Sequence, residues 1–156
     1  MLIADVAERY TDLVTTVFSS TIAMKAWFAT AALVLAGGQV VTAARIYGRV
    51  NFLPERGRGI ARAHRWSGRL AFLCTLPVAF HCIFILGFDS TDSRTLAHSI
   101  AGSFVYGVFA VKIFFVHDRD HPRWTLPLVG GALAAVIVTL WLTSAYWYFT
   151  NVRFGL

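Results

Sequence analysis

Long apolar runs alternate with short polar segments along this chain, and four of the runs are long enough to cross a bilayer. A membrane-crossing helix needs about 20 mainly apolar residues. The expected spans are residues 26–44, 70–88, 95–116 and 124–150. The segment before them, residues 2–18, places apolar side chains at helical spacing with charged side chains on the other face. It is predicted to be an amphipathic helix on the membrane surface. Ser19, Ser20 and Thr21 then break it or cap the next helix.

The composition favours an all-α membrane protein with a single domain over residues 1–156, a bundle of four transmembrane helices preceded by the interfacial helix. The chain is 57% hydrophobic and 14% charged, whereas soluble domains carry about 25% charged residues. Its net charge of +6 does not indicate nucleic acid, because the arginines gather in loops beside apolar spans, as they do in membrane proteins. The lipid bilayer is therefore the expected partner.

Arginines are concentrated between the first two spans, in residues 45–69, which hold seven arginines and a single acid. The glycines of this segment and Pro54 predict a turn-rich linker. Together with the third loop, this side of the membrane carries ten Lys and Arg residues, and the other side carries four. Positive loops face the cytoplasm, so we expect both termini outside the inner (plasma) membrane. Gly37 and Gly38 in the first span are expected to admit a close neighbour.

Two histidines, His81 and His98, lie inside apolar spans, where an ionisable side chain is costly and needs a partner. The segment between these spans, residues 89–94, is short and polar, so we expect the two spans to be antiparallel neighbours. His81 then lies about 10 Å and His98 about 5 Å from the span ends, a mismatch of about one turn. Facing helices can supply two neutral imidazoles to the iron of a b-type haem. We predict His81 and His98 as axial ligands of haem b.

Other residues extend this candidate site. Gly102 follows His98 by one turn on the same face and leaves room for a flat ring. Arg94 could pair with a haem propionate from the rim. His64 and His117 on the cytoplasmic side form a second candidate pair for a second haem, and a His-x-x-x-Gly pattern occurs at both His64 and His98. The spacing is less favourable there, because His64 and His81 are roughly 100° out of phase on one helix.

Alternatives to haem ligation remain open for each histidine. Those near the arginines, His64, His117 and His121, also fit the role of ordinary interfacial residues. His81 could instead bond a carbonyl that Pro77 leaves free, or a hydroxyl such as that of Ser103. Zinc or copper would need a third ligand.

Acidic and thiol groups add little chemistry to the spans. No Asp or Glu lies inside a span, which weakens the interpretation as a proton-coupled transporter. Cys74 and Cys82 are eight residues apart on one predicted helix. They would be roughly 12 Å apart, too far for a disulfide with each other. Cys82 follows His81 but points about 100° round the helix.

The stretch from His64 to Phe72, with the later His81, resembles the haem-bearing helix of ferric reductase and NADPH oxidase type membrane domains. His98 with Gly102 is similar to the ligand pattern of ascorbate-reducible dihaem cytochromes b. Over the arginine loop and the last three spans, the chain resembles a family of small bacterial four-span membrane proteins of unassigned function. The resemblance implies bis-histidine haem b and electron transfer, with His64 and His81 on one helix and His98 and His117 opposite.

The function expected from these features is that of a membrane-bound b-type cytochrome with one or two haems and no catalytic residues of its own. It would carry electrons between a quinol or membrane redox partner and an extracytoplasmic redox protein. We expect an electron-transfer subunit of an oxidoreductase, in a homo- or hetero-oligomer, rather than a complete enzyme. The alternative is a haem-free structural or assembly subunit of a larger membrane complex. An absorption spectrum separates the two.

Overall fold

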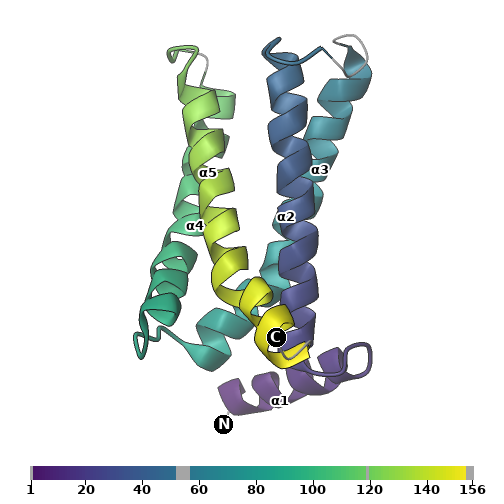
Figure 1. The fold of residues 1–156 in the computed structure, drawn as a ribbon, viewed down its shortest axis with the longest axis vertical. Coiled ribbons are helices and arrows are strands. Elements are labelled where there is room, and N and C mark those ends of the chain that lie inside the picture. The colour runs from purple at the N-terminus through teal and green to yellow at the C-terminus, as the bar shows by residue number, and fades with distance from the viewer. Residues whose placement is uncertain (1, 52–56, 119, 154–156) are drawn as a thin grey trace.

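The computed structural model describes residues 2–51, 57–118 and 120–153, which are helical for most of their length (Figure 1). In chain order the elements are α1 (Leu2–Thr15), α2 (Thr21–Ile46), α3 (Arg58–Phe80), the π-helical η1 (His81–Leu86), α4 (Ser93–His117), α5 (Thr125–Trp141), and the π-helical η2 (Leu142–Tyr146) and η3 (Phe149–Arg153). Four helices are long and apolar enough to cross a membrane: Thr21–Ile46, Arg58–Leu86, Ser93–His117 and Thr125–Val152. The predicted all-α fold with four such helices is confirmed.

The four long helices form two antiparallel hairpins, α2 with α3 and α4 with α5 (Figure 1). The hairpins are joined by packing of α2 against α5, and they diverge toward the end that carries the arginine-rich loop. The consecutive helices α3 and α4 run in opposite directions, as expected. They are not packed backbone to backbone over the described residues, and each lies against its own hairpin partner instead. The expectation that spans two and three are direct neighbours is corrected in this respect.

Small side chains bring the two hairpins together at one end. Ala23 and Ala26 of α2 pack with Ala145 of η2 and with Tyr148 in a buried cluster. Alanines allow close backbone approach, which matters in a bilayer because lipid tails are as apolar as the side chains they would replace. The first helix, α1, lies across this same end of the bundle (Figure 1). The buried cluster that joins the hairpins therefore lies at the α1 end.

Two helix starts differ from the sequence-based boundaries. Helix α2 begins at Thr21, because the Ser20 hydroxyl accepts a hydrogen bond from the Ala23 amide at 3.1 Å and caps it. This confirms the predicted cap and places the helix start before residue 26. Helix α3 begins at Arg58, so the second half of the predicted linker 45–69 is helical. Arginine is a good helix former; Gly57 is the N-cap of this helix, and Gly59 is tolerated in its first turn.

The lower part of α3 changes geometry at the proline. Pro77 lies inside α3, and the helix continues from His81 as the π-helical η1, which ends at Leu86 and is followed by Gly87 with φ of 74°. Proline and π-helical turns are the usual causes of helix distortion. The Tyr10 hydroxyl of α1 donates to the Pro77 carbonyl at 2.9 Å, and the Tyr10 ring contacts Phe80 and His81. Helix α1 is thereby docked on the distorted turn.

Candidate functional site

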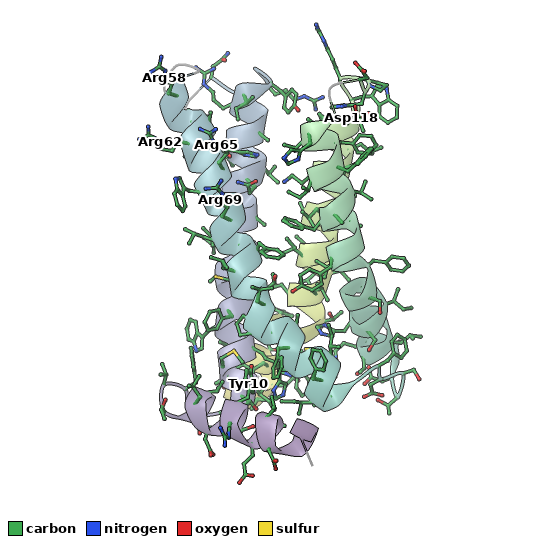
Figure 2. The ribbon with its side chains drawn as sticks, turned by 180° about the vertical axis from the view of Figure 1, so that it is seen from behind. Tyr10, Arg58, Arg62, Arg65, Arg69 and Asp118 are labelled. Carbon is green, nitrogen blue, oxygen red and sulfur yellow. The ribbon has the colours of Figure 1, made fainter. Side chains whose placement is uncertain are left out.

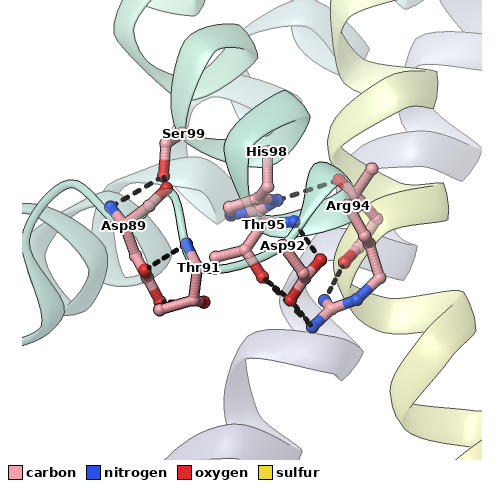
Figure 3. Close-up of polar contacts among 8 residues, drawn as sticks. Asp89, Thr91, Asp92, Arg94, Thr95, His98 and Ser99 are labelled. Carbon is pink, nitrogen blue, oxygen red and sulfur yellow. Dashed lines mark hydrogen bonds and ion pairs between the residues drawn. The ribbon is translucent and has the colours of Figure 1, made fainter.

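The first turn of α4 is held by a cap that positions His98. Asp92 accepts hydrogen bonds from the Thr95 amide at 2.9 Å and from the Thr95 hydroxyl at 2.7 Å (Figure 3). The hydroxyl and then the amide of Thr95 hold the pKa of the exposed Asp92 carboxyl below its ordinary value. An ionised carboxylate at the N-terminus also favours the helix dipole. His98 therefore follows a turn of fixed geometry.

The loop before α4 is tied to the same turn. The Ser99 hydroxyl donates to the Asp89 carbonyl at 2.9 Å and accepts from the Asp89 amide at 3.1 Å (Figure 3). The Asp89 carboxylate accepts from the Thr91 amide at 2.9 Å. These bonds close the short connection between η1 and α4 over the turn that carries His98. The connection thus fixes the position of the histidine relative to η1.

One ring nitrogen of His98 is committed to a threonine. The Nδ1 atom lies 3.0 Å from the Thr143 hydroxyl oxygen, and that hydroxyl donates its own hydrogen to the Thr139 carbonyl at 2.7 Å. The Leu140 carbonyl lies 3.3 Å from the same hydroxyl and is close enough to the His98 ring to interact with it. When the hydroxyl gives its one hydrogen to the Thr139 carbonyl, its oxygen is an acceptor, and His98 donates to it from Nδ1. The neutral ring then carries its lone pair on Nε2, the nitrogen that binds metals in this tautomer.

A cavity of about 400 Å³ lies between the two hairpins, and His98 is in its wall. All four long helices contribute to the lining, which is mainly apolar. Pockets for small molecules and cofactors are typically 300–1,000 Å³ and apolar with a few polar groups. The polar groups here include the Tyr106 hydroxyl and the Cys82 thiol. Gly102, one turn from His98, also lines the cavity.

His81 is buried close to this cavity but does not line it. Its exposed fraction is 5%, and its ring lies 5.8 Å from the Tyr10 ring, on the side of η1 that faces α1. The next residue, Cys82, is in the cavity wall. Among the described residues, no hydrogen-bond partner reaches the buried Nδ1 of His81. The structure therefore brings His81 and His98 to the same end of the bundle without placing both rings on one cavity wall.

Arg94 is held by groups of the protein itself. Its guanidinium donates to the Thr143 carbonyl at 2.7 Å, lies 4.5 Å above the Trp147 ring and is 3.7 Å from the Asp92 carboxylate. Figure 3 shows these polar contacts beside His98. The Thr143 residue thus receives Arg94 on its carbonyl and His98 on its hydroxyl. Arg94 is not among the residues that line the cavity, and its hydrogen bonds run to the Thr143 carbonyl and to the Thr95 hydroxyl.

His64, at the opposite end of α3, repeats the arrangement found at His98. Its Nδ1 lies 2.9 Å from the Thr42 hydroxyl, which donates to the Gly38 carbonyl at 2.6 Å. The Gln39 carbonyl lies 3.2 Å from the same hydroxyl and close to the His64 ring, in the position that the Leu140 carbonyl has beside His98. With the Thr42 hydrogen on the Gly38 carbonyl, His64 likewise donates from Nδ1, which leaves the lone pair on Nε2. Two histidines on different hairpins share one mode of orientation by a threonine on the partner helix.

The Gln39 side chain explains one of the two His-x-x-x-Gly patterns. Its amide donates to the His64 carbonyl and, at 2.7 Å, to the Ser67 hydroxyl. A Cβ added at Gly68 would lie 3.0 Å from the Gln39 Oε1. The close approach expected at Gly37 and Gly38 is corrected, since a Cβ there would meet no described atom within 4 Å. The tight contact is at Gly68 because a polar side chain crosses between the helices there.

The remaining histidines are near the ends of α4 and its following loop. His117 is exposed, and its Nδ1 donates to the Ile113 carbonyl at 2.9 Å. His121 packs its ring 5.5 Å from Phe115, and its buried Nδ1 has no partner among the described residues. His117 and His64 lie at the same end of the bundle by topology, and no contact joins them in the described part of the chain. No group of three or more His, Cys, Asp or Glu residues that could hold a metal ion occurs there either.

Aromatic side chains bridge α3 and α4 between the two histidine levels. Phe72 stacks on Phe109 with ring centroids 4.6 Å apart, and it meets the Tyr106 ring edge-on. The Tyr106 hydroxyl donates to the Thr75 hydroxyl at 3.1 Å. Because α3 and α4 lack close backbone packing, these long side chains are what connects them. Sequence reasoning missed Thr42, Thr143 and Gln39, since a threonine or glutamine in an apolar span has many roles, and only the fold shows which histidine it faces.

Comparison with known proteins places the chain in a family without assigning it an activity. A family described as "Family of unknown function (DUF6529)" matches residues 4–156, and the chain belongs to this family. No curated protein and no solved structure matches the chain. The resemblance to ferric reductase-like and cytochrome b membrane domains thus rests on the sequence motifs alone.

Proposed function

We propose that this member of the DUF6529 family is a membrane-bound b-type cytochrome whose haem lies between the two hairpins, with His98 as an axial ligand. It would carry electrons between a quinol or membrane redox partner and an extracytoplasmic redox partner. The distribution of arginines favours both termini outside, and the resemblance to small bacterial membrane proteins implies the plasma membrane of a bacterium. In this proposal the protein is an electron-transfer subunit of an oxidoreductase.

The orientation of the His98 ring is the observation that carries the proposal. The Thr143 hydroxyl lies 3.0 Å from Nδ1, where it can accept the ring N–H, and the same ring borders a cavity of about 400 Å³ between the helices. Metal-bound histidines almost always donate their second ring N–H to a protein acceptor, which sets the tautomer and the ring plane. Helix bundles hold haems between facing helices in this way.

His81 is proposed as the second axial ligand. The ring is buried and its Nδ1 has no hydrogen-bond partner among the described residues. These two observations support a role for His81 in binding a ligand. Its ring faces Tyr10, so ligation requires the side chain to turn from α1 toward the cavity. The neighbouring Cys82 thiol already lines the cavity and is the competing ligand by position. Thiolate and imidazole ligation give haem clearly different spectra, so the two are separable.

The residues of the chain have distinct tasks in this proposal. A bound haem b supplies one-electron exchange at its iron. The apolar cavity wall excludes water, and Thr143 holds the His98 ring in place for ligation. Arg94 contributes positive charge at the rim, where propionates would lie, while its guanidinium stays bonded to the Thr143 carbonyl. The Phe72 and Phe109 stack separates this level from the level of His64.

A more specific version of the proposal places a second haem at the level of His64. The Thr42 hydroxyl orients His64 as Thr143 orients His98, and this repeated arrangement supports His64 as a ligand. His117, whose Nδ1 is bonded to Ile113, would be its partner from α4. Two haems per chain would support this form. One haem per chain, unchanged by His64→Ala, would confine the site to His98.

Absorption spectra of the purified protein test the proposal. The protein is produced in cells supplied with haem, and spectra are recorded oxidised and after dithionite reduction, with haem and iron measured per chain. We expect the sharp, split visible bands of low-spin haem with two imidazole ligands, lost in His98→Ala and His81→Ala. His121→Ala is the matched control, since His121 has no role in the proposed site. A colourless protein with no iron would favour a haem-free structural or assembly subunit.

A further inference from the structure

Four arginines form a stripe along one face of α3, which we call the arginine stripe: Arg58, Arg62, Arg65 and Arg69 (Figure 2). Their spacing of four, three and four residues places them on one side of a helix that turns about 100° per residue. All four side chains are exposed. Among the described residues, none of the four forms an ion pair with an acidic side chain. The ion pair found there joins Arg94 and Asp92. The stripe extends about 16 Å along the helix axis.

The residues that follow Arg69 on the same side of α3 show which environment surrounds the arginine stripe. Leu73 and Leu76 follow Arg69 at the same helical spacing, and they are 55% and 41% exposed. Exposed leucines on a helix long and apolar enough to cross a membrane face lipid tails. One helix face therefore changes from arginine to leucine between Arg69 and Leu73. This change marks the boundary between the polar and hydrocarbon regions of the bilayer.

A tryptophan beside the stripe places it at the level of the headgroups. Trp66 is 55% exposed, and the Arg69 guanidinium lies 5.2 Å from its ring centroid. Tryptophan is enriched at membrane–water interfaces, where its ring is apolar and its N–H is polar. Arg62 and Arg65 stand within one turn of Trp66. These arginines thus lie where lipid phosphates lie, and a soluble partner would have to displace lipid to reach them.

We propose that the arginine stripe binds the headgroups of anionic phospholipids in the leaflet at this end of the protein. Guanidinium groups bind phosphate oxygens with two parallel hydrogen bonds, and clusters of basic residues at a span end attract anionic lipids. A row of guanidinium groups down one helix face, with lipid-facing leucines below, fits a headgroup whose acyl chains lie against Leu73 and Leu76. The inference is independent of haem binding.

Lipid binding to the full chain in neutral detergent tests the proposal. Native mass spectrometry measures retention of dioleoyl phosphatidylglycerol against dioleoyl phosphatidylcholine. We expect the wild type to prefer phosphatidylglycerol and the variant Arg62→Gln/Arg65→Gln/Arg69→Gln to bind it at least about tenfold more weakly. The charge-matched control Arg9→Gln/Arg49→Gln/Arg123→Gln, which changes exposed arginines outside the stripe, should keep the preference.

Further arms distinguish sources and folding defects. Inorganic phosphate should displace no more lipid than sodium chloride of equal ionic strength; specific competition by phosphate would overturn the proposal in favour of a free-anion site. If the glutamine variant fails to fold, Arg62→Lys/Arg65→Lys/Arg69→Lys takes its place in the test. This variant keeps the charge, and we expect it to bind phosphatidylglycerol several-fold more weakly than the wild type. Equal binding of the two lipids by the wild type, or unchanged preference in a folded stripe variant, would refute lipid recognition and assign the stripe to protein docking.

Discussion

The Nδ1 atom of His98 lies 3.0 Å from the hydroxyl oxygen of Thr143, a residue 45 positions later in the chain. The same hydroxyl bonds the Thr139 carbonyl, and with its hydrogen on that carbonyl its oxygen accepts from the ring Nδ1–H. A helix of one hairpin thus carries the ligand candidate, and the second helix of the same hairpin orients it. The cavity on which His98 borders lies between this hairpin and the other one.

Replacing the orienting threonine should weaken haem binding without removing a ligand. In Thr143→Val the ring loses its acceptor, and we expect haem affinity to fall by roughly 10- to 100-fold, as for other supporting hydrogen bonds at metal sites. The midpoint potential of the remaining haem should also shift. Haem per chain and a redox titration measure both. Thr139→Val, whose hydroxyl bonds only within its own helix, should match the wild type, and equal haem content in all three proteins would contradict the role of Thr143.

A methyl group at Gly68 should destabilise the α2–α3 hairpin. The added Cβ would lie 3.0 Å from the Gln39 Oε1, and that side chain is held by the His64 carbonyl and the Ser67 hydroxyl. We expect Gly68→Ala to lower the free energy of unfolding by about 1–3 kcal/mol, as for other overpacked sites. Denaturation in detergent, followed by circular dichroism, measures the change.

Two controls separate crowding from a general effect of alanine. Gly107→Ala places a Cβ in open space and should leave stability unchanged or slightly higher, because alanine favours helix. In the Gln39→Ala background the crowding group is gone, so Gly68→Ala should cost less there than in the wild type. The same cost in both backgrounds would mean that the contact with Gln39 is not the cause.

The docking of α1 should weaken in alkali through Tyr10. Burial, and then the nearby Cys82, raise the pKa of the Tyr10 hydroxyl above its ordinary value of about 10. A raised folded-state pKa means that the contribution is complete below pH 10 and is lost as pH rises through the folded-state value. Hydrogen exchange of α1 amides between pH 8 and about 11 should show this release.

Tyr10→Phe isolates the hydroxyl from the ring. It removes the bond to the Pro77 carbonyl and should cost about 0.5–1.5 kcal/mol in α1 docking at neutral pH. The ring contacts with Phe80 and His81 remain, so α1 should stay helical. We expect the alkaline release of α1 to disappear in this variant. If it persists, another group is responsible for the pH dependence.

Acid should fray the first turn of α4 through Asp92. The Thr95 hydrogen bonds lower the pKa of the Asp92 carboxyl, so its contribution is present above the unfolded-state value of about 4 and is lost as pH falls through the folded-state value. Amide exchange in the first turn of α4 should therefore speed up at low pH and be fast at all pH in Asp92→Ala. Asp92→Asn keeps an acceptor oxygen without titrating, and acid-dependent exchange in this variant would contradict the assignment.

Local patterns in the sequence predict much of the fold. Four runs of apolar residues predict four long helices, because crossing a bilayer requires length and apolarity alone. The Ser20 cap and the distortion at Pro77 also follow from local rules, since they depend on neighbours within a few residues. The helical start of α3 was missed because glycines in an arginine-rich stretch resemble a loop, although the stretch is helical from Arg58.

The sequence by itself determined the helices, the antiparallel order of the spans and the two ends at which the histidines lie. Only the tertiary structure decided that α3 packs on α2, that His98 and His64 are oriented by Thr143 and Thr42, that His81 turns toward Tyr10, and that Gly68 rather than Gly37 is crowded. The physical reason is that lipid and protein interior are equally apolar. A hydrophobic pattern therefore fixes where a span lies but not which of its faces meets another helix.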